Sequence, residues 1–429
     1  MSGTPVSNVD ARGYVLVHIV AGESLADLIA SQVIDHMRTQ ARTNGPRRPA
    51  RVVALFLEPA RVALGSRMRR RVASFRRRAP EIDVVLHPYV SRLGVRRNAW
   101  LVARRLRRKA RGQRIVFHCR GEYAVEWAAA IREHLPQSAI IADIRGAWPE
   151  EFLFARGYDG PEGADADSLQ GYAYHRARLR SSLDRAAGVI SVSPGMIEWL
   201  EGEGAPKDRL TYVPCCVPTV SFERATREKA RADLSLSHQI VLAYAGTLGK
   251  YQHIGDGVIP FFRAMAERHN DVHLLAIVSD SEALRRMLPA QGIPPDRATV
   301  MTVAQGEVAR YLSAADAGLL LRAPSRMNRF SQPTKLGEYL AAGLPVIVSR
   351  GTGRVDRLIE DNAAGFVVDV FDVSWSRLVS EADRVWRGLR AGSDELRRNA
   401  LALCSREFLW SSYTERVRDA YVSALATQP

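Results

Sequence analysis

The chain has few cysteines: Cys119, Cys215, Cys216 and Cys404 are the four among 429 residues. Their positions form no disulfide framework and no CxxC spacing of the kind that binds zinc. The adjacent Cys215 and Cys216 could form a strained disulfide, but two reduced thiols are the better interpretation. Scarce and scattered cysteines exclude a disulfide-built secreted domain and favour a cytoplasmic location.

Long hydrophobic runs are absent as well. No segment approaches the ~18 consecutive apolar residues of a membrane-spanning helix, and no basic region leading into an apolar stretch predicts a secretory signal. With 46% hydrophobic and 25% charged residues, the composition is that of a globular protein. The length suffices for two domains, each with its own core. The sequence therefore predicts a soluble two-domain protein.

Acidic residues are outnumbered by basic ones, 46 to 61, which gives a net charge of +15. The excess is concentrated in residues 51–114, which hold 19 Lys and Arg against 3 Asp and Glu. Residues 61–78 and 92–114 interleave arginines with apolar side chains, a pattern that can bind anionic membranes at about 1 kcal/mol per basic residue. A solvated arginine-rich surface is the alternative. Nucleic-acid binding is not expected, because no RNP, KH or helix-turn-helix pattern accompanies the charge.

Short apolar segments alternate with amphipathic ones along the chain, which predicts parallel sheets covered by helices. The strands expected in the first half are Tyr14–Val20, Arg51–Glu58, Ile82–His87, Arg114–His118, Ala139–Asp143, Gly188–Val192 and Leu210–Val213. Those expected in the second half are Ile240–Gly246, Val272–Val278, Thr299–Val303, Gly318–Arg322, Pro345–Ser349 and Gly365–Val368. Two Rossmann-like units follow, joined within residues 214–232.

Residues 332–348 carry the most specific pattern in the chain. Pro333 is expected to be the first residue of a short helix, and Gly343 to end it. The first turn of such a helix exposes backbone N–H groups that can hold a phosphate. Thr334 and Lys335 add a hydroxyl and a cation at that end, and Glu338 lies one turn further on, within reach of a ribose hydroxyl. The segment therefore predicts a site for a nucleotide diphosphate.

This helix resembles the donor-binding helix of the GT-B glycosyltransferases of family 4, which are retaining enzymes that use nucleotide sugars. The resemblance extends to residues 244–250, 311–316 and, more weakly, 143–151 and 192–196. It implies an α/β GT-B fold with two Rossmann-like domains facing each other across a cleft. The acceptor-binding domain would comprise residues 1–218, completed by a returning helix at 406–425, and the nucleotide-sugar-binding domain residues 219–405.

The donor side departs from the family pattern at two positions. Gly246 and Lys250 follow a strand end and suit a diphosphate, but Thr247 stands where the family commonly has an arginine. The family places two glutamates eight positions apart; Glu338 matches the second, whereas Phe330 occupies the first. The sugar is then expected to be recognised differently, with Ser331 and nearby groups as candidates. The donor-binding residues predicted in this way are Gly246, Thr247, Lys250, Ser331, Thr334, Lys335 and Glu338.

The acceptor side is predicted from residues that follow strands of the first half. His118 and Asp143 are the catalytic candidates, because an imidazole or a carboxylate there could orient or deprotonate an acceptor hydroxyl. Gly22, Glu23 and Arg145 are the acceptor-binding candidates. Each of these groups could instead be structural, for example through an Asp143–Arg145 salt bridge.

No metal or other cofactor is expected. Asp165-Ala166-Asp167 is a DxD sequence, but it lies in a polar glycine-rich loop and is interpreted as accidental. The resemblance implies a hexosyltransferase-like enzyme that moves a sugar to a glycan or lipid-linked acceptor in bacterial surface polysaccharide or glycolipid assembly, at the inner face of the cytoplasmic membrane. A non-catalytic GT-B scaffold and a nucleotide-sugar epimerase are the alternatives.

Overall fold

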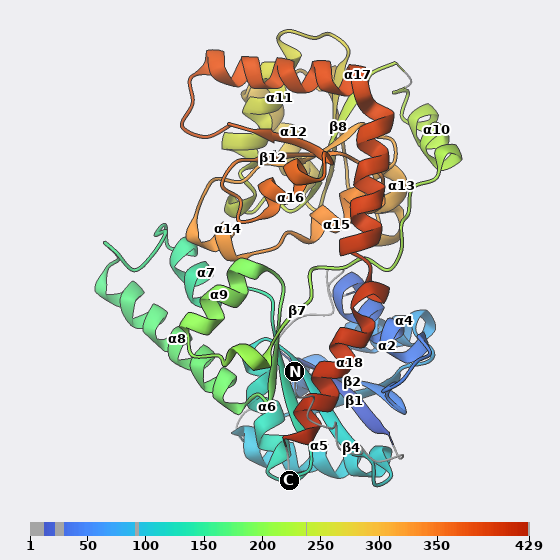
Figure 1. Cartoon of the computed structure of the whole chain (residues 1–429), viewed down its shortest axis with the longest axis vertical. Helices are drawn as coiled ribbons and strands as arrows, with labels where there is room; N and C mark the ends of the chain where they lie inside the picture. The colour runs from blue at the N-terminus through green and yellow to red at the C-terminus, as the bar shows by residue number, and fades with distance from the viewer. Residues whose placement is uncertain (1–12, 22–29, 91–93, 237, 428–429) are drawn as a thin grey trace, which may run out of the picture. The chain divides into compact units, whose positions relative to one another are not determined.

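The computed structural model describes residues 13–21, 30–90, 94–236 and 238–427. The chain folds into two compact units, one formed by Met1–Pro214 with Trp410–Pro429 and the other by Cys215–Leu409 (Figure 1). The boundaries expected from the sequence were residues 218 and 406. Each unit is described by itself below.

The first unit is built on a parallel sheet with the strand order β3-β2-β1-β4-β5-β6-β7. The strands lie close to the predicted segments: β1 (Tyr14–Ala21), β2 (Arg51–Pro59), β3 (Asp83–Tyr89), β4 (Arg114–Arg120), β5 (Ala139–Ile144), β6 (Gly188–Ser191) and β7 (Leu210–Tyr212). Most of β1, β2, β4 and β5 is buried, because helices cover both faces of the sheet and leave little room for polar side chains.

Helices connect these strands in the expected order. They are α2 (Asp35–Arg42), α3 (Ala60–Ala63), α4 (Ser66–Arg78), α5 (Gly94–Ala110), α6 (Glu122–Arg132), α7 (Trp148–Ala155), α8 (Ala166–Arg185) and α9 (Pro194–Gly202), with a short π-helix, η1 (Ala30–Ile34), before α2 and a 3₁₀ turn, η3 (Lys207–Arg209), before β7. The last helix, α18 (Trp410–Ala426), contacts α2 and the strands β4 to β7 of this unit.

The second unit has the strand order β10-β9-β8-β11-β12-β13, again with every pairing among the described strands parallel. Its strands are β8 (Ile240–Gly246), β9 (Val272–Val278), β10 (Ala298–Met301), β11 (Ala317–Leu320), β12 (Val346–Ser349) and β13 (Gly365–Val368). Its α-helices are α10 (Arg224–Asp233), α11 (Ile259–Ala266), α12 (Ser281–Ala290), α13 (Val308–Leu312), α14 (Arg326–Phe330), α15 (Thr334–Ala341), α16 (Val355–Asp361) and α17 (Trp375–Glu407).

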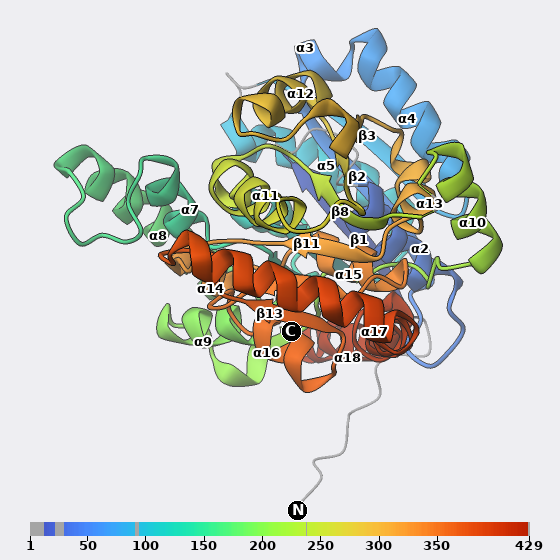
Figure 2. The same ribbon diagram turned by 90° about the horizontal axis from the view of Figure 1, so that it is seen from above.

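The long helix α17 differs from the prediction. It packs against α11 and α15. Its backbone leaves helical angles at Gly392, and Figure 1 shows the resulting bend. Figure 2 shows the long part of α17 that precedes the bend. The helix expected at 406–425 is therefore split. Residues up to Glu407 belong to α17, whereas α18 starts at Trp410. Phe408 and Leu409 were expected on one helix face with Tyr413 but lie in the break between α17 and α18.

Each sheet reverses its strand order once, between β1 and β4 in the first unit and between β8 and β11 in the second. Ligands of open α/β sheets bind beyond the carboxyl ends of the strands at this switch point. The architecture confirms the expected fold class, with two parallel Rossmann-like sheets. Among the residues that the structure describes, every helix is too short or too polar to cross a bilayer.

Candidate active site

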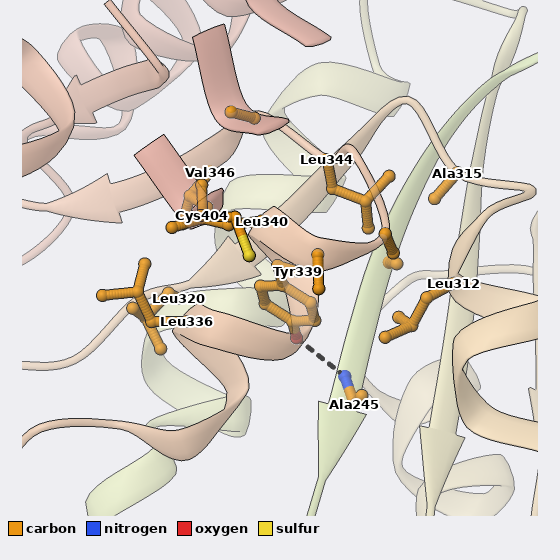
Figure 3. Close-up of a cluster of buried hydrophobic side chains, with 14 of the residues drawn as sticks. Ala245, Leu312, Ala315, Leu320, Leu336, Tyr339, Leu340, Leu344, Val346 and Cys404 are labelled. Carbon is orange, nitrogen blue, oxygen red and sulfur yellow. Dashed lines mark hydrogen bonds between the residues drawn. The ribbon is translucent and has the colours of Figure 1, made fainter. Parts of the chain in front are cut away.

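The helix α15 lies in the second unit and is fixed by its apolar face. Leu336, Tyr339 and Leu340 are fully buried, as the sequence pattern predicted, and Figure 3 shows them within one hydrophobic cluster. The backbone N–H of Ala245, near the end of β8, donates to the Tyr339 hydroxyl over 2.9 Å. The helix is thereby held against the strand that precedes the Gly246 loop.

The two ends of α15 follow the prediction with one correction. Gly343, with φ of +68°, follows the C-cap residue Ala342, as expected for a left-handed residue at a helix end. Pro333, however, is not the first helical residue: it has extended angles and precedes Thr334, and its carbonyl accepts the Leu336 N–H. The helix therefore starts one residue later, at Thr334.

Lys335 is buried, with 6% of its surface exposed. Its ammonium donates to the Gln252 side-chain oxygen over 2.7 Å and lies 4.2 Å from the Tyr244 ring centroid. Burial, together with the charge of Arg322, lowers the pKa of Lys335 well below its ordinary value, and Glu338 opposes that change. The cation predicted from sequence is present, but in a desolvated site rather than on an open helix end.

Gly246 lies against this lysine. Its φ of +142° suits glycine, and an added Cβ would lie 3.2 Å from the Lys335 amine. Thr247 and Lys250 follow on the same loop, both exposed. The structure thus joins Gly246 and Lys335, as the donor-site prediction required, and leaves the Lys250 side chain in solvent.

Arg322 is the residue of this region that the sequence analysis missed. It follows β11, at the switch point of the second sheet, and 6% of its surface is exposed. Its guanidinium donates to the Gln252 side-chain oxygen over 3.3 Å and to the Ser331 hydroxyl over 3.4 Å, while its Nε is buried without a partner. The signal that could have found it is a cation directly beyond a central strand of a Rossmann-like sheet.

Glu338 is half-buried beside these cations, not facing solvent. It accepts a long hydrogen bond of 3.5 Å from the Gln305 amide. Burial raises the pKa of Glu338, and Lys335 and Gln305 partly offset that effect. Thr334 and Ser331 are also half-buried. Contacts connect four of the predicted donor residues, Gly246, Ser331, Lys335 and Glu338, directly or through Arg322 and Gln252.

The acceptor-side candidates form a buried network in the first unit. Arg145 Nε donates to both oxygens of Asp143 over 2.9 Å, and His118 Nε2 lies 3.1 Å from the same carboxylate. The other His118 nitrogen lies 2.8 Å from the Tyr421 hydroxyl of α18. Burial alone would raise the pKa of Asp143, but Arg145 and the His118 hydrogen bond outweigh it and hold that pKa below its usual range.

This arrangement corrects the prediction for His118 and Asp143. Neither residue ends its strand, because pairing continues to Arg120 on β4 and to Ile144 on β5. Their exposed fractions are 1% and 2%, and both His118 nitrogens are engaged. Arg145 is likewise occupied by Asp143 and by Gln32. A general base needs hydrogen-bond access to its substrate, and in the form described both residues are buried and engaged with other protein groups.

Three histidines, His18, His36 and His118, lie close together in the same core, with ligand atoms within 4.8 Å of one another. His18 and His118 are paired residues of β1 and β4, and their rings stack at 4.1 Å with an interplanar angle of 28°. Lone pairs of nearly parallel stacked imidazoles do not converge on one ion. Burial lowers the pKa of His18 and of His36 well below the ordinary value, and neighbouring His118 adds to the effect. The cluster is a packed set of imidazoles.

Two predictions remain, the acceptor-binding pair Gly22 and Glu23 and the accidental DxD sequence. Gly22 and Glu23 lie outside the described residues. Asp165 accepts the Ser168 N–H as the N-cap of α8, which accounts for the DxD sequence by helix capping.

The two basic stretches lie on opposite faces of the first sheet, which was not anticipated. The path from β2 to β3 through α4 and the path from β3 to β4 through α5 run in opposite directions along the strand order. Right-handed crossovers then place the two helices on opposite faces. In Figure 1, α4 lies beside α2 and α5 beside α6. A single flat membrane surface therefore cannot contact the outer faces of both α4 and α5. Arg92, the first residue of the second basic stretch, lies outside the described residues.

Comparison with known families gives one match. Residues 239–385, within the second unit, match the family model described as glycosyl transferases group 1. None of the curated proteins matches the chain significantly.

Solved structures resemble the chain over nearly its full length. HepE of Anabaena in complex with UDP has a TM-score of 0.68 at 13% identity and covers 96% of this chain and 100% of its own. A glycosyltransferase from Rickettsia africae has a TM-score of 0.69 at 12% identity, with 97% and 100% covered. WaaG, a glycosyltransferase involved in lipopolysaccharide biosynthesis, has a TM-score of 0.58 at 15% identity, with 94% and 98% covered. At these identities the likeness establishes the fold.

The fold and the matched domain agree. The chain has the GT-B fold, and its second unit carries a glycosyltransferase group 1 domain, which confirms the enzyme class expected from the sequence, a glycosyltransferase.

Proposed function

We propose that this protein is a retaining glycosyltransferase that transfers a sugar from a nucleotide sugar to a glycan or lipid-linked acceptor in the assembly of bacterial surface polysaccharide or glycolipid. The observation that carries the proposal is the pair of buried cations, Lys335 and Arg322, beside Gly246 and the first turn of α15. A nucleotide diphosphate needs this combination of positive charge and backbone donors. The structure of HepE with UDP and the role of WaaG in lipopolysaccharide biosynthesis support the choice of substrates.

The proposed reaction is a front-face displacement. The bond between the anomeric carbon and the diphosphate oxygen breaks, and the acceptor oxygen bonds to that carbon on the same face. The acceptor proton moves to the departing phosphate oxygen. Preorganised donors stabilise the charge that develops on the leaving group, and Lys335, Arg322 and the N–H groups of α15 would supply them. Glu338 would hold the ribose. No metal ion is expected to take part.

The acceptor side would use a membrane surface formed by α3 and α4. Here Val62 and Leu64 are exposed, Leu64 to 65%, beside the arginines of α4. Arg70, Arg76 and Arg77 have no carboxylate partner among the described residues. On α5, Arg96 and Lys109 are engaged by Glu133 and Asp83, although Trp100 and Leu101 are exposed there as well. Exposed apolar side chains among unpaired cations are typical of proteins that lie on anionic lipid.

The activity is tested with the full chain in two steps. A thermal-shift screen against UDP, GDP, ADP and dTDP should identify one nucleotide that raises the melting temperature, because a ligand stabilises the state that binds it. The matching nucleotide sugars are then offered with a lipid-linked acceptor, and the anomeric configuration of the product is read by NMR. Inversion of configuration would contradict the retaining mechanism. Failure of all four nucleotides to bind would leave a non-catalytic scaffold as the function.

The membrane surface is tested with two variants of equal charge. Arg70, Arg76 and Arg77 are replaced by Gln in one, and Arg97, Arg104 and Arg108 of α5 in the other. The first variant should lose binding to vesicles that contain phosphatidylglycerol, by about 1 kcal/mol per arginine, and the second should bind like the wild type. Equal losses in both variants, or equal binding to neutral vesicles, would contradict a specific surface on α3 and α4.

A further inference from the structure

Gln252 lies between two cations that hydrogen-bond no carboxylate among the described residues, although Glu338 lies near Lys335. Its side-chain oxygen accepts from Lys335 over 2.7 Å and from Arg322 over 3.3 Å, and all three side chains are at most 7% exposed. Within the described part of the chain, neither cation hydrogen-bonds a carboxylate. Buried charges in proteins are normally paired with an opposite charge. A neutral amide oxygen is a weak substitute for one.

The guanidinium of Arg322 is also incompletely hydrogen-bonded. Its two side-chain contacts are long, at 3.3 and 3.4 Å, and both go to neutral groups. Its Nε has no partner although it is buried. A guanidinium presents more N–H donors than are used here, in a planar fork that matches phosphate oxygens. The site is therefore built for an acceptor that is not part of the protein.

The position of this site, at the switch point of the second sheet and beside the first turn of α15, favours a phosphate group as the ligand. Arg322 follows β11 and Gly246 ends β8, and these paired strands flank the switch point of the second sheet. Lys335 reaches the same place from the first turn of α15 and lies close to Gly246. Gln252 comes from the short turn η4 (Lys250–Gln252), which His253 follows in a left-handed conformation with φ of +49°.

We propose that Gln252 is an internal stand-in for the ligand: its amide oxygen holds the place of a phosphate oxygen between Lys335 and Arg322, and the diphosphate of the donor displaces it. This inference rests on the proposed function and adds two residues to it. Arg322 becomes a direct ligand of the diphosphate, in compensation for the neutral Thr247. Gln252 becomes a positioning residue that keeps the two cations in place until the donor arrives.

The decisive variant is Gln252→Glu, which changes one amide to a carboxylate of nearly the same size. A carboxylate pairs with both cations, so the melting temperature of the ligand-free protein should rise. The nucleotide must then displace a charged group, so its affinity should fall by about 10- to 100-fold. Gln252→Ala should show the reverse, a lower melting temperature and a higher nucleotide affinity, because no side-chain oxygen remains to be displaced. A purely structural glutamine would make both variants less stable and leave affinity unchanged, which would overturn the proposal.

Arg322 is tested by calorimetry with two probes, the nucleotide identified by thermal shift and inorganic pyrophosphate. Arg322→Gln should weaken both by about 10- to 100-fold, because the lost contacts are to phosphate. Arg268→Gln, at an exposed arginine of the same unit, is the matched control and should bind like the wild type. Wild-type affinity in a folded Arg322→Gln protein would refute this inference but leave the proposed function in place. Failure of the wild-type protein to bind any of the four nucleotides would overturn both.

Discussion

The two units each bury a cluster of charged side chains, and the clusters differ in whether the charges are balanced. In the first unit, the Asp143 carboxylate is met by Arg145 and His118, and the opposite side of His118 is met by Tyr421. In the second, Lys335 and Arg322 share one neutral oxygen of Gln252. A balanced network holds a core together, whereas an unbalanced one has capacity left for a ligand. We therefore propose ligand binding for the second cluster and a structural role for the first, although both are buried.

The largest expected effect comes from breaking the balanced network. Asp143→Asn removes the charge that compensates Arg145, and loss of one partner of a buried ion pair costs about 3–5 kcal/mol of unfolding free energy. Denaturant unfolding measures the loss, and Asp208→Asn, at an exposed position, is the control. Nucleotide affinity should stay unchanged. A fully stable Asp143→Asn protein that had lost only sugar transfer would restore the catalytic role first predicted for this residue.

The buried histidines of the first unit should make its unfolding free energy depend on pH. Burial, with the nearby charges of Arg145 and Arg120, lowers the pKa of His18 and His36 in the folded state, while Asp143 opposes this at His36. In the unfolded chain both titrate near pH 6.5. The unfolded state therefore binds more protons below that pH, and the unfolding free energy falls as pH drops, by about 1.4 kcal/mol per pH unit for each histidine. Asp143, whose pKa is lowered, adds to the loss only below about pH 4.

Denaturant unfolding at pH 7.5, 6.5 and 5.5 checks this dependence. A His18→Asn variant should show a shallower slope between pH 6.5 and 5.5 than the wild type, because one of the two titrating groups is gone. Stability that is constant across this range would show that the cluster accepts protons without cost, and the buried network would then not be balanced in the sense argued above.

Removal of one cation from the Lys335–Arg322 pair should have the opposite effects to Asp143→Asn: stability should be kept and nucleotide affinity should fall. Lys335→Met removes a buried cation that lacks a carboxylate partner, so unfolding free energy should be unchanged or higher. Nucleotide affinity should fall by about 10- to 100-fold, as expected for a charged hydrogen bond to phosphate. Calorimetry and denaturant unfolding of the same samples give both values. A variant that loses stability but keeps its affinity would make Lys335 a structural residue.

The smallest effect is expected at Glu338. Replacing it with Gln keeps the shape and removes the charge, so a ribose hydrogen bond would weaken and nucleotide affinity should fall by roughly 3- to 10-fold. Inorganic pyrophosphate has no ribose and should bind as to the wild type, which provides an internal control. Equal weakening of both probes would assign Glu338 to the electrostatics of the cations rather than to the ribose.

Much of the fold could be predicted because its determinants are local. The strands β8, β9 and β13 have the predicted limits, since apolar runs bounded by turn residues specify buried parallel strands. The helix α15 was predicted from Pro333, Gly343 and three apolar residues on one face. The limits of α17 and α18 were not, because the break between them at Phe408 and Leu409 carries no proline or glycine.

The candidate site was predicted in part. Gly246 and Lys335 were named from strand ends and helix ends, and the structure brings them together. Arg322 was missed although it lies just beyond a central strand, and Gln252 was missed because nothing in its sequence neighbours distinguishes it from other polar residues. The burial of His118 against Tyr421 was not predicted either, because Tyr421 lies 303 residues away along the chain.

By itself, then, the sequence determined two parallel sheets, the order of their strands along the chain and the short helix for which we propose phosphate binding, because apolar periodicity and helix-terminal residues act over a few positions. Only the tertiary structure decided which buried polar groups are paired with oppositely charged groups of the protein and which are not. It buried Asp143 with its partners and left Lys335 and Arg322 without a hydrogen-bonded carboxylate among the described residues. That distinction depends on desolvation and on contacts between distant segments, and both arise when the chain has folded.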